Sequence, residues 1–168
     1  MQSGGGLAYG WDQWYKNMLP AATAVHNANP NALIVFSGLD YDTKLGPVVK
    51  GEKLTSDGKT FDVDSVPYSN RIVLELHQYD WGITECQSMK DGLWNNGFSA
   101  HDVNAKYKIP VIMSEWGMDQ TQAAYSSVYA QCLKQILPEW DAGWFHWAIG
   151  GSYYIRSGTP DYDETWGE

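Results

Sequence analysis

The chain has 168 residues, a length typical of one domain and shorter than most complete eight-unit α/β barrels, which need roughly 250. Its formal net charge of -9 disfavours nucleic acids and anionic membrane surfaces as partners, and no apolar run approaches the ~20 residues that span a bilayer. Neutral partners fit better, because 9 Trp and 11 Tyr supply flat rings that stack on sugar faces or fill a core. The first six residues lack the features of a signal peptide, so a secreted form is expected to carry its leader outside this chain.

The first elements in the chain are a predicted helix and a predicted buried strand. Residues 11–26 place apolar side chains at helical intervals, and we expect Pro20 to kink or divide the helix. Residues 32–36 are too short and too continuously apolar for an amphipathic helix. They predict a buried strand of a parallel sheet.

A long polar excursion follows. Residues 40–70 are rich in turn residues and show little helical periodicity. Within them, residues 53–55 and 60–63 flank a Ser-Asp-Gly-Lys sequence, which predicts a small hairpin. A loop of this length is uncommon without a role.

Residues 71–79 predict a second strand with one polar face. Because side chains alternate along a strand, Glu75, His77 and Tyr79 share a face, and two leucines share the other. The polar face is therefore expected to line an enclosed site or a barrel interior. Glu75 lies one pleat deeper than His77 and is interpreted as a buried structural carboxylate.

The rest of the chain continues the alternation of helices and strands. We expect a helix over residues 85–95, a short helix over 101–107, a strand over 109–117, a helix over 123–137 closed by Pro138, a strand over 142–151 and a loop over 152–168. This order predicts an α/β fold.

The strand over residues 109–117 ends in a carboxylate. Pro110 can open a strand, and Gly117 releases the chain into a turn directly after Glu115 and Trp116. At the C-terminal end of a strand in a helix-wrapped parallel sheet, a Glu is placed to meet a ligand. The alternative is a Glu that caps a helix or pairs with an arginine, and this stretch alone leaves both interpretations open.

Three successive strand ends carry chemically useful side chains: Tyr79 with His77, Glu115 with Trp116, and Trp147. Neighbouring strands lie about 4.8 Å apart, so these groups can converge on one pocket. A carboxylate that attacks an anomeric carbon, a phenol and an imidazole that orient it, and indoles that support a sugar ring would form a glycosidase site.

The sequence resembles glycoside hydrolase family 5, the cellulase-like family. Residues 76–79 resemble the family's His-x-Tyr motif on strand six, residues 114–117 its nucleophile motif Glu-x-Gly on strand seven, residues 144–147 its strand eight, and residues 148–156 the fungal and plant-like members. The resemblance implies a (β/α)8 TIM barrel and a secreted, retaining β-glycosidase that hydrolyses a β-glucan or related polysaccharide without a cofactor or metal. It assigns Glu115 as the nucleophile, His77 and Tyr79 as its catalytic partners, and Trp116 and Trp147 as substrate-binding residues.

The chain departs from that family at the general acid/base. Family members carry an Asn-Glu pair at the end of strand four, and no Asn-Glu dipeptide occurs in the 168 residues. We therefore expect residues 1–168 to form a single partial catalytic domain with strands five to eight of the barrel. Its expected partners are a carbohydrate and either the missing half-barrel or a second copy of the chain. The alternative is a catalytically inert, carbohydrate-binding remnant.

The two cysteines, Cys86 and Cys132, have no metal-ligand spacing, and the sequence alone leaves a disulfide and two buried thiols open. In the barrel that the resemblance implies, they would lie on consecutive outer helices, and we hypothesise that they are bonded. A metal site built from His77, His101 and His146 is disfavoured, because the three histidines are not paired at ligand spacing.

Overall fold

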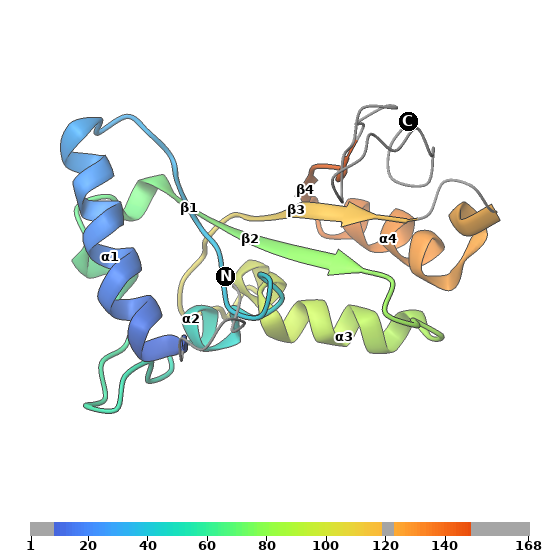
Figure 1. Ribbon diagram of the computed structural model, residues 1–168, viewed down its shortest axis with the longest axis horizontal. Helices are drawn as coiled ribbons and strands as arrows, with labels where there is room; N and C mark the ends of the chain where they lie inside the picture. The colour runs from blue at the N-terminus through green and yellow to red at the C-terminus, as the bar shows by residue number, and fades with distance from the viewer. Residues whose placement is uncertain (1–8, 119–122, 149–168) are drawn as a thin grey trace, which may run out of the picture. The chain divides into compact units, whose positions relative to one another are not determined.

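The computed structural model describes residues 9–118 and 123–148 (Figure 1). The chain divides into two compact units. Unit 1 comprises Met1–Leu76 and Leu93–Ile112, and unit 2 comprises His77–Gly92 and Met113–Glu168. No helix among the described residues is long and apolar enough to cross a membrane.

Unit 1 begins with helix α1, which runs without interruption over Trp11–Ala28 although it contains Pro20. Pro20 therefore does not divide the helix, contrary to one of the two outcomes expected. A proline inside a helix costs about 3 kcal/mol, and tertiary packing of the apolar face has to offset it. Trp14, which is completely buried, supplies part of this packing and donates its indole N–H to the Ser37 carbonyl at 2.7 Å.

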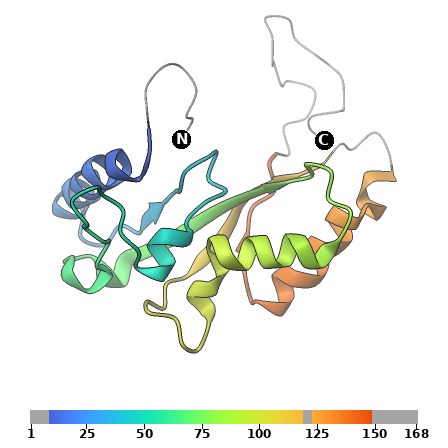
Figure 2. The ribbon, with the colours of Figure 1, turned by 90° about the horizontal axis from the view of Figure 1, so that it is seen from below.

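The core of unit 1 forms where α1 meets strand β1, Ile34–Phe36. The rings of Trp14, Phe36 and Phe61 lie 5.4 to 5.9 Å apart in tilted and edge-to-face pairs. Strand β1 pairs in parallel with the start of β2, and Ile34 lies opposite Ile72. Figure 2 gives the same ribbon seen from below. The predicted parallel strand is thus present, two residues shorter at its start.

The excursion between β1 and β2 contains helix α2, Gly46–Lys50, which the sequence pattern did not predict. The expected hairpin is reduced to one antiparallel bridge, Lys53 to Thr60, next to a hydrogen bond from Leu54 N to Lys59 O at 2.7 Å. Two 3-10 turns, Val63–Ser65 and Ser69–Arg71, complete the excursion.

A left-handed turn lies at the start of the excursion. Asp40, Tyr41 and Asp42 have φ angles of 50°, 57° and 63°, a conformation that L residues rarely adopt in succession. The buried carboxylate of Asp42 accepts a hydrogen bond from the Gly38 N–H, and Thr43 donates its hydroxyl to the Asp40 carbonyl at 2.8 Å. These local bonds stabilise a backbone that would otherwise be strained.

Strand β2, Ile72–Tyr79, shows the predicted alternation. Ile72, Leu74 and Leu76 are buried at 0 to 3 % exposure, while the residues between them are half-buried. The sheet has four strands in the order β1, β2, β3, β4, and Leu74 N donates to Pro110 O at 2.8 Å just before β3 begins. A parallel sheet with intervening helices is the α/β arrangement that the sequence predicts.

Strands β3, Val111–Gly117, and β4, Gly143–Trp144, belong to the second half of the chain. Within unit 2, Phe145 N donates to Met113 O and Trp147 N donates to Trp116 O, both at 2.9 Å. Strand β4 is two residues long where residues 142–151 were predicted, and residues 149–151 and the predicted loop over 152–168 lie outside the described residues.

The helices of the second half are α3, Cys86–Asn96, and α4, Val128–Glu139. The prediction for 85–95 is confirmed within one residue. The single helix predicted over 123–137 is instead a 3-10 turn, Ala123–Ser126, followed by α4, because Ser127 caps a new helix by accepting from Ala130 N at 3.1 Å. Pro138 lies inside the last turn of α4 rather than after it.

The prediction of a short helix over residues 101–107 is wrong. A 3-10 helix, Phe98–His101, ends where the predicted helix would begin. Asp102 then accepts from the Asn104 backbone N–H at 2.7 Å, which is an Asx turn. Short polar side chains that bond to nearby backbone compete with helix formation in this way.

Candidate active site

The candidate site lies in unit 2, where β2 and β3 end. Tyr79 is the last residue of β2, and Glu115 lies two residues before the end of β3. The Tyr79 hydroxyl donates to Oε2 of Glu115 at 3.0 Å, and Nδ1 of His77 lies 3.5 Å from the same oxygen. The structure thus brings together the three residues that the sequence proposes as catalytic.

The carboxylate of Glu115 is neither buried among helices nor fully exposed. Its side chain is 27 % exposed and that of His77 is 20 % exposed, so a ligand can reach the carboxylate while its neighbours restrict its orientation. Two neighbours on one oxygen restrict the rotamer of Glu115. The alternative of a Glu that only caps a helix or pairs with an arginine has no support among these contacts.

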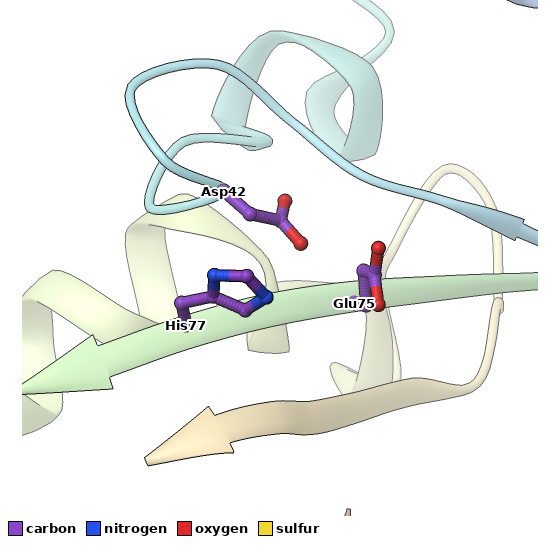
Figure 3. Close-up of side chains that lie close together, drawn as sticks. All are labelled: Asp42, Glu75 and His77. Carbon is purple, nitrogen blue, oxygen red and sulfur yellow. The ribbon is translucent and has the colours of Figure 1, made fainter. Parts of the chain in front are cut away.

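Glu75 lies on the same side of β2 as His77, two residues earlier (Figure 3). Within unit 1 its carboxylate lies within 4.8 Å of that of Asp42, and Glu75 is half-buried. Glu75 was interpreted from the sequence as a buried structural carboxylate, and the structure shows it half-buried rather than buried. Two carboxylates provide fewer than the six or more oxygen ligands that a calcium ion takes, and we assign no metal to this pair.

Trp116 points to the other side of β3 from Glu115, as the alternation of a strand requires. Its ring packs against Trp144, with centroids 5.4 Å apart, and against His146 at 4.8 Å. The indole nitrogen of Trp116 is buried without a hydrogen-bond partner among the described residues. These contacts place Trp116 in a cluster of rings. His146, one of the three histidines considered above as metal ligands, packs in the same cluster.

Trp147, the second predicted sugar-binding residue, is 53 % exposed. Its main chain is held next to β3 by the bond from its N–H to Trp116, and the Trp147–Ala148 peptide bond is cis. Gly117 permits this close approach, because a Cβ at Gly117 would lie 2.4 Å from the Trp147 carbonyl oxygen. A bulkier residue at position 117 would separate the two chains.

Tyr129 is a residue of the site that the sequence analysis missed. It is the second residue of α4 and is completely buried. Its hydroxyl donates to Gln78 O at 2.6 Å and accepts from Gly117 N at 3.3 Å. Burial raises the pKa of Tyr129 far above its usual range. The only signal in the sequence was its position on the apolar face of a predicted helix, which does not distinguish this role from core filling.

Cys86 and Cys132 form a disulfide within unit 2 that joins the first residue of α3 to the fifth residue of α4. Their Cα atoms lie 5.3 Å apart. An ion pair from Lys90 to Glu139 at 2.5 Å links the same two helices. Both helices are therefore tied to each other beside the strand ends.

His101, the third histidine considered as a metal ligand, has a structural role in unit 1. Its Nε2 accepts a hydrogen bond from Val111 N at 3.2 Å, and its ring packs edge-on against Phe98 at 5.7 Å. A ring nitrogen that accepts from the backbone is not available to a metal at the same time. The bond instead fixes the first residue of β3.

Retaining glycosidases use a carboxylate as their nucleophile. Glu115, which accepts a hydrogen bond from the phenol of Tyr79, is a carboxylate near the end of a strand. The family model of cellulase, glycosyl hydrolase family 5, matches residues 2–152. The chain therefore belongs to glycosyl hydrolase family 5, whose fold is a (β/α)8 barrel.

A curated relative agrees with this assignment. The chain is 32% identical over 169 residues to a glycosyl hydrolase 5 family protein of Chamaecyparis obtusa. The match covers 92% of this chain and 28% of the relative. The chain thus spans less than a third of the length of that protein.

Proposed function

We propose that this chain carries the nucleophile half of a retaining β-glycosidase site, with Glu115 as the nucleophile. The observation that carries the proposal is the hydrogen bond of 3.0 Å from the Tyr79 hydroxyl to Glu115 in a chain of this family. Glu115 would attack the anomeric carbon of a β-glucan or related polysaccharide, with Tyr79 and His77 holding the attacking carboxylate.

The sugar contacts of this proposal come from tryptophan. Trp147 is more than half exposed, and its main chain is bonded to the residue after Glu115, so its indole would support a ring beside the nucleophile. Trp116 packs against other rings, and its contribution to binding would come from the edge that this cluster leaves accessible.

The four strands of the sheet would correspond to strands five to eight of the barrel. In this arrangement β1, β2, β3 and β4 follow one another in the sheet as they do in the chain, which is the order of strands in a barrel. The general acid/base would then come from a strand outside these four, and the missing half-barrel is the partner that would supply it. The disulfide supports a secreted protein, because oxidising compartments favour such bonds.

The alternative is a carbohydrate-binding remnant without turnover. It is favoured by the absence of an Asn-Glu dipeptide, since losing general acid/base assistance costs on the order of 100- to 10,000-fold in rate. Binding would need only the aromatic and polar walls of the site. The two functions differ in whether a bond to Glu115 forms.

The test uses an aryl β-glycoside whose leaving group needs no protonation, with and without azide. We expect slow release of the phenol, faster release with azide, and no reaction of an unactivated β-glucan. Glu115→Gln should abolish release and keep most of the oligosaccharide binding. Glu85→Gln, the same substitution at an exposed residue of unit 2, is the matched control. Equal activity of the Glu115→Gln variant would disprove the proposal.

A further inference from the structure

Tyr129 contacts the main chain of both strands that carry the candidate site. Its hydroxyl uses its single proton to donate to Gln78 O at 2.6 Å and a lone pair to accept from Gly117 N at 3.3 Å. Gln78 lies in β2 and Gly117 is the last residue of β3. One phenol therefore connects the ends of two neighbouring strands.

The two bonded peptide groups flank the reactive side chains. Gln78 stands between His77 and Tyr79, and Gly117 follows Glu115 by two residues. A shift of either peptide group changes the separation between the Tyr79 hydroxyl and Glu115, which is now 3.0 Å. Hydrogen bonds weaken steeply when their geometry departs from such values.

Helix α4 gives Tyr129 a fixed starting point. Ser127 caps the helix by accepting from Ala130 N at 3.1 Å, and Cys132 joins the helix to Cys86 through the disulfide. Tyr129 lies between these two attachments. Its ring is thus held on an element that resists displacement, which a positioning contact requires.

Phenylalanine would fill almost the same space as Tyr129, so packing alone does not require the hydroxyl. Tyr129 is completely buried, and a buried hydroxyl without partners would destabilise the fold. Burial raises the pKa of Tyr129, which favours the protonated phenol that donates to Gln78 O. Both of its bonds go to the strand ends.

We infer that Tyr129 is a positioning residue that sets the separation of Tyr79 and Glu115 by holding the main chain at Gln78 and Gly117. The inference rests on the proposed function, in which Glu115 is the nucleophile. Tyr129 touches no substrate and acts through the two strands. Through Tyr129, the capped start of helix α4 restrains the distance between Tyr79 and Glu115.

The test measures how fast Glu115 is labelled by a 2-deoxy-2-fluoro β-glycoside with a dinitrophenolate leaving group. A bond forms between a Glu115 oxygen and the anomeric carbon while the bond to the aryl oxygen breaks, and dinitrophenolate leaves with the electron pair. Intact mass gives the labelling rate, and its dependence on probe concentration separates the maximal rate from binding. We expect Tyr129→Phe to lower the maximal rate about 10-fold or more with little change in binding.

A matched control and a double mutant separate positioning from general loss of stability. Tyr68→Phe deletes the hydroxyl of another completely buried tyrosine, which bonds to the Leu19 carbonyl in unit 1, and should leave the labelling rate unchanged. The double variant Tyr79→Phe/Tyr129→Phe should label no more than about twofold slower than Tyr79→Phe, because Tyr129 acts through Tyr79. Additive effects of the two substitutions, or an unchanged rate in Tyr129→Phe, would overturn the inference.

Two further outcomes distinguish this inference from the proposed function. If the unaltered chain takes no label at Glu115, the proposed function fails and the inference fails with it. If the unaltered chain is labelled at Glu115 and Tyr129→Phe is labelled at the same rate, the inference fails and the proposed function stands. If Tyr129→Phe does not fold, the rate of hydrogen exchange of the Gly117 amide in the unaltered chain tests the bond to Tyr129 instead. Slow exchange supports the bond to Tyr129, and exchange at the rate of a free peptide contradicts it.

Discussion

Three aromatic side chains of unit 1 and two of unit 2 lie in opposite environments. In unit 1, Trp14, Phe36 and Phe61 are at most 1 % exposed, and the indole N–H of Trp14 is bonded to a carbonyl. In unit 2, Trp144 and Trp147 are each 53 % exposed. Aromatic content therefore does not reveal whether a ring is buried in a core or exposed.

The position of a ring relative to the end of a strand makes the difference. The core rings come from the first turn of α1, from β1 and from the excursion, where they can pack on one another. Trp144 is the last residue of β4 and Trp147 follows it by three residues. Side chains beyond a parallel strand end have fewer neighbours and are free to meet a ligand.

The largest effect that we predict is on the core of unit 1. Trp14→Ala removes a completely buried indole and its hydrogen bond to Ser37, and should lower the free energy of unfolding by about 3–5 kcal/mol. Urea unfolding followed by circular dichroism measures this loss. A loss comparable to that of an exposed tryptophan would contradict the comparison between the two units.

Removal of the disulfide should have the next largest effect. Cys86 and Cys132 are 46 residues apart, and opening the loop in Cys86→Ala/Cys132→Ala should cost about 2–4 kcal/mol. Titration of the native, unreduced chain should find no free thiol before or after denaturation. Two reactive thiols after denaturation would show that the bond is absent.

A pH effect should follow from Tyr129. Because its pKa is raised in the folded state, its contribution to stability is complete below the unfolded pKa of about 10 and is lost as the pH rises above it. The loss is at most about 1.4 kcal/mol per pH unit. The stability difference between the unaltered chain and Tyr129→Phe should therefore narrow between about pH 10 and 11. Urea midpoints at several pH values measure it, and a difference that stays constant would contradict the raised pKa.

The smallest effect on stability is expected at Trp147. Its side chain is half exposed, so Trp147→Ala should change the free energy of unfolding by less than about 0.5 kcal/mol. It should nevertheless weaken binding of β-glucan oligosaccharides, which calorimetry can measure. Unchanged binding together with lost stability would show that Trp147 belongs to a core and not to a binding surface.

The sequence predicted the strands because their patterns are local. The alternation of Leu74 and Leu76 with Glu75 and His77 matches the burial of β2, and the end of β3 lies where Gly117 follows Glu115. It failed where local side chains competed with the helix, as at Asp102 and Ser127. Of the two outcomes expected at Pro20, division of the helix does not occur, because packing of α1 outweighs the local penalty.

The candidate site was predictable only in part for a related reason. Tyr79 and Glu115 could be paired from strand periodicity and from the resemblance to the family. Tyr129 could not, because both of its partners are main-chain groups of Gln78 and Gly117, and a backbone partner leaves no mark in the sequence.

The central claim, that Glu115 is a nucleophile that forms a bond to the sugar, is tested most directly by the anomeric configuration of the azide product. Two successive displacements at the anomeric carbon retain configuration, whereas one inverts it. The account predicts that the chain converts an activated aryl β-glycoside and azide into the β-glycosyl azide, identified by proton NMR, and that Glu115→Gln forms none. An α-glycosyl azide from the unaltered chain, or the β-product at the same rate from Glu115→Gln, would contradict it.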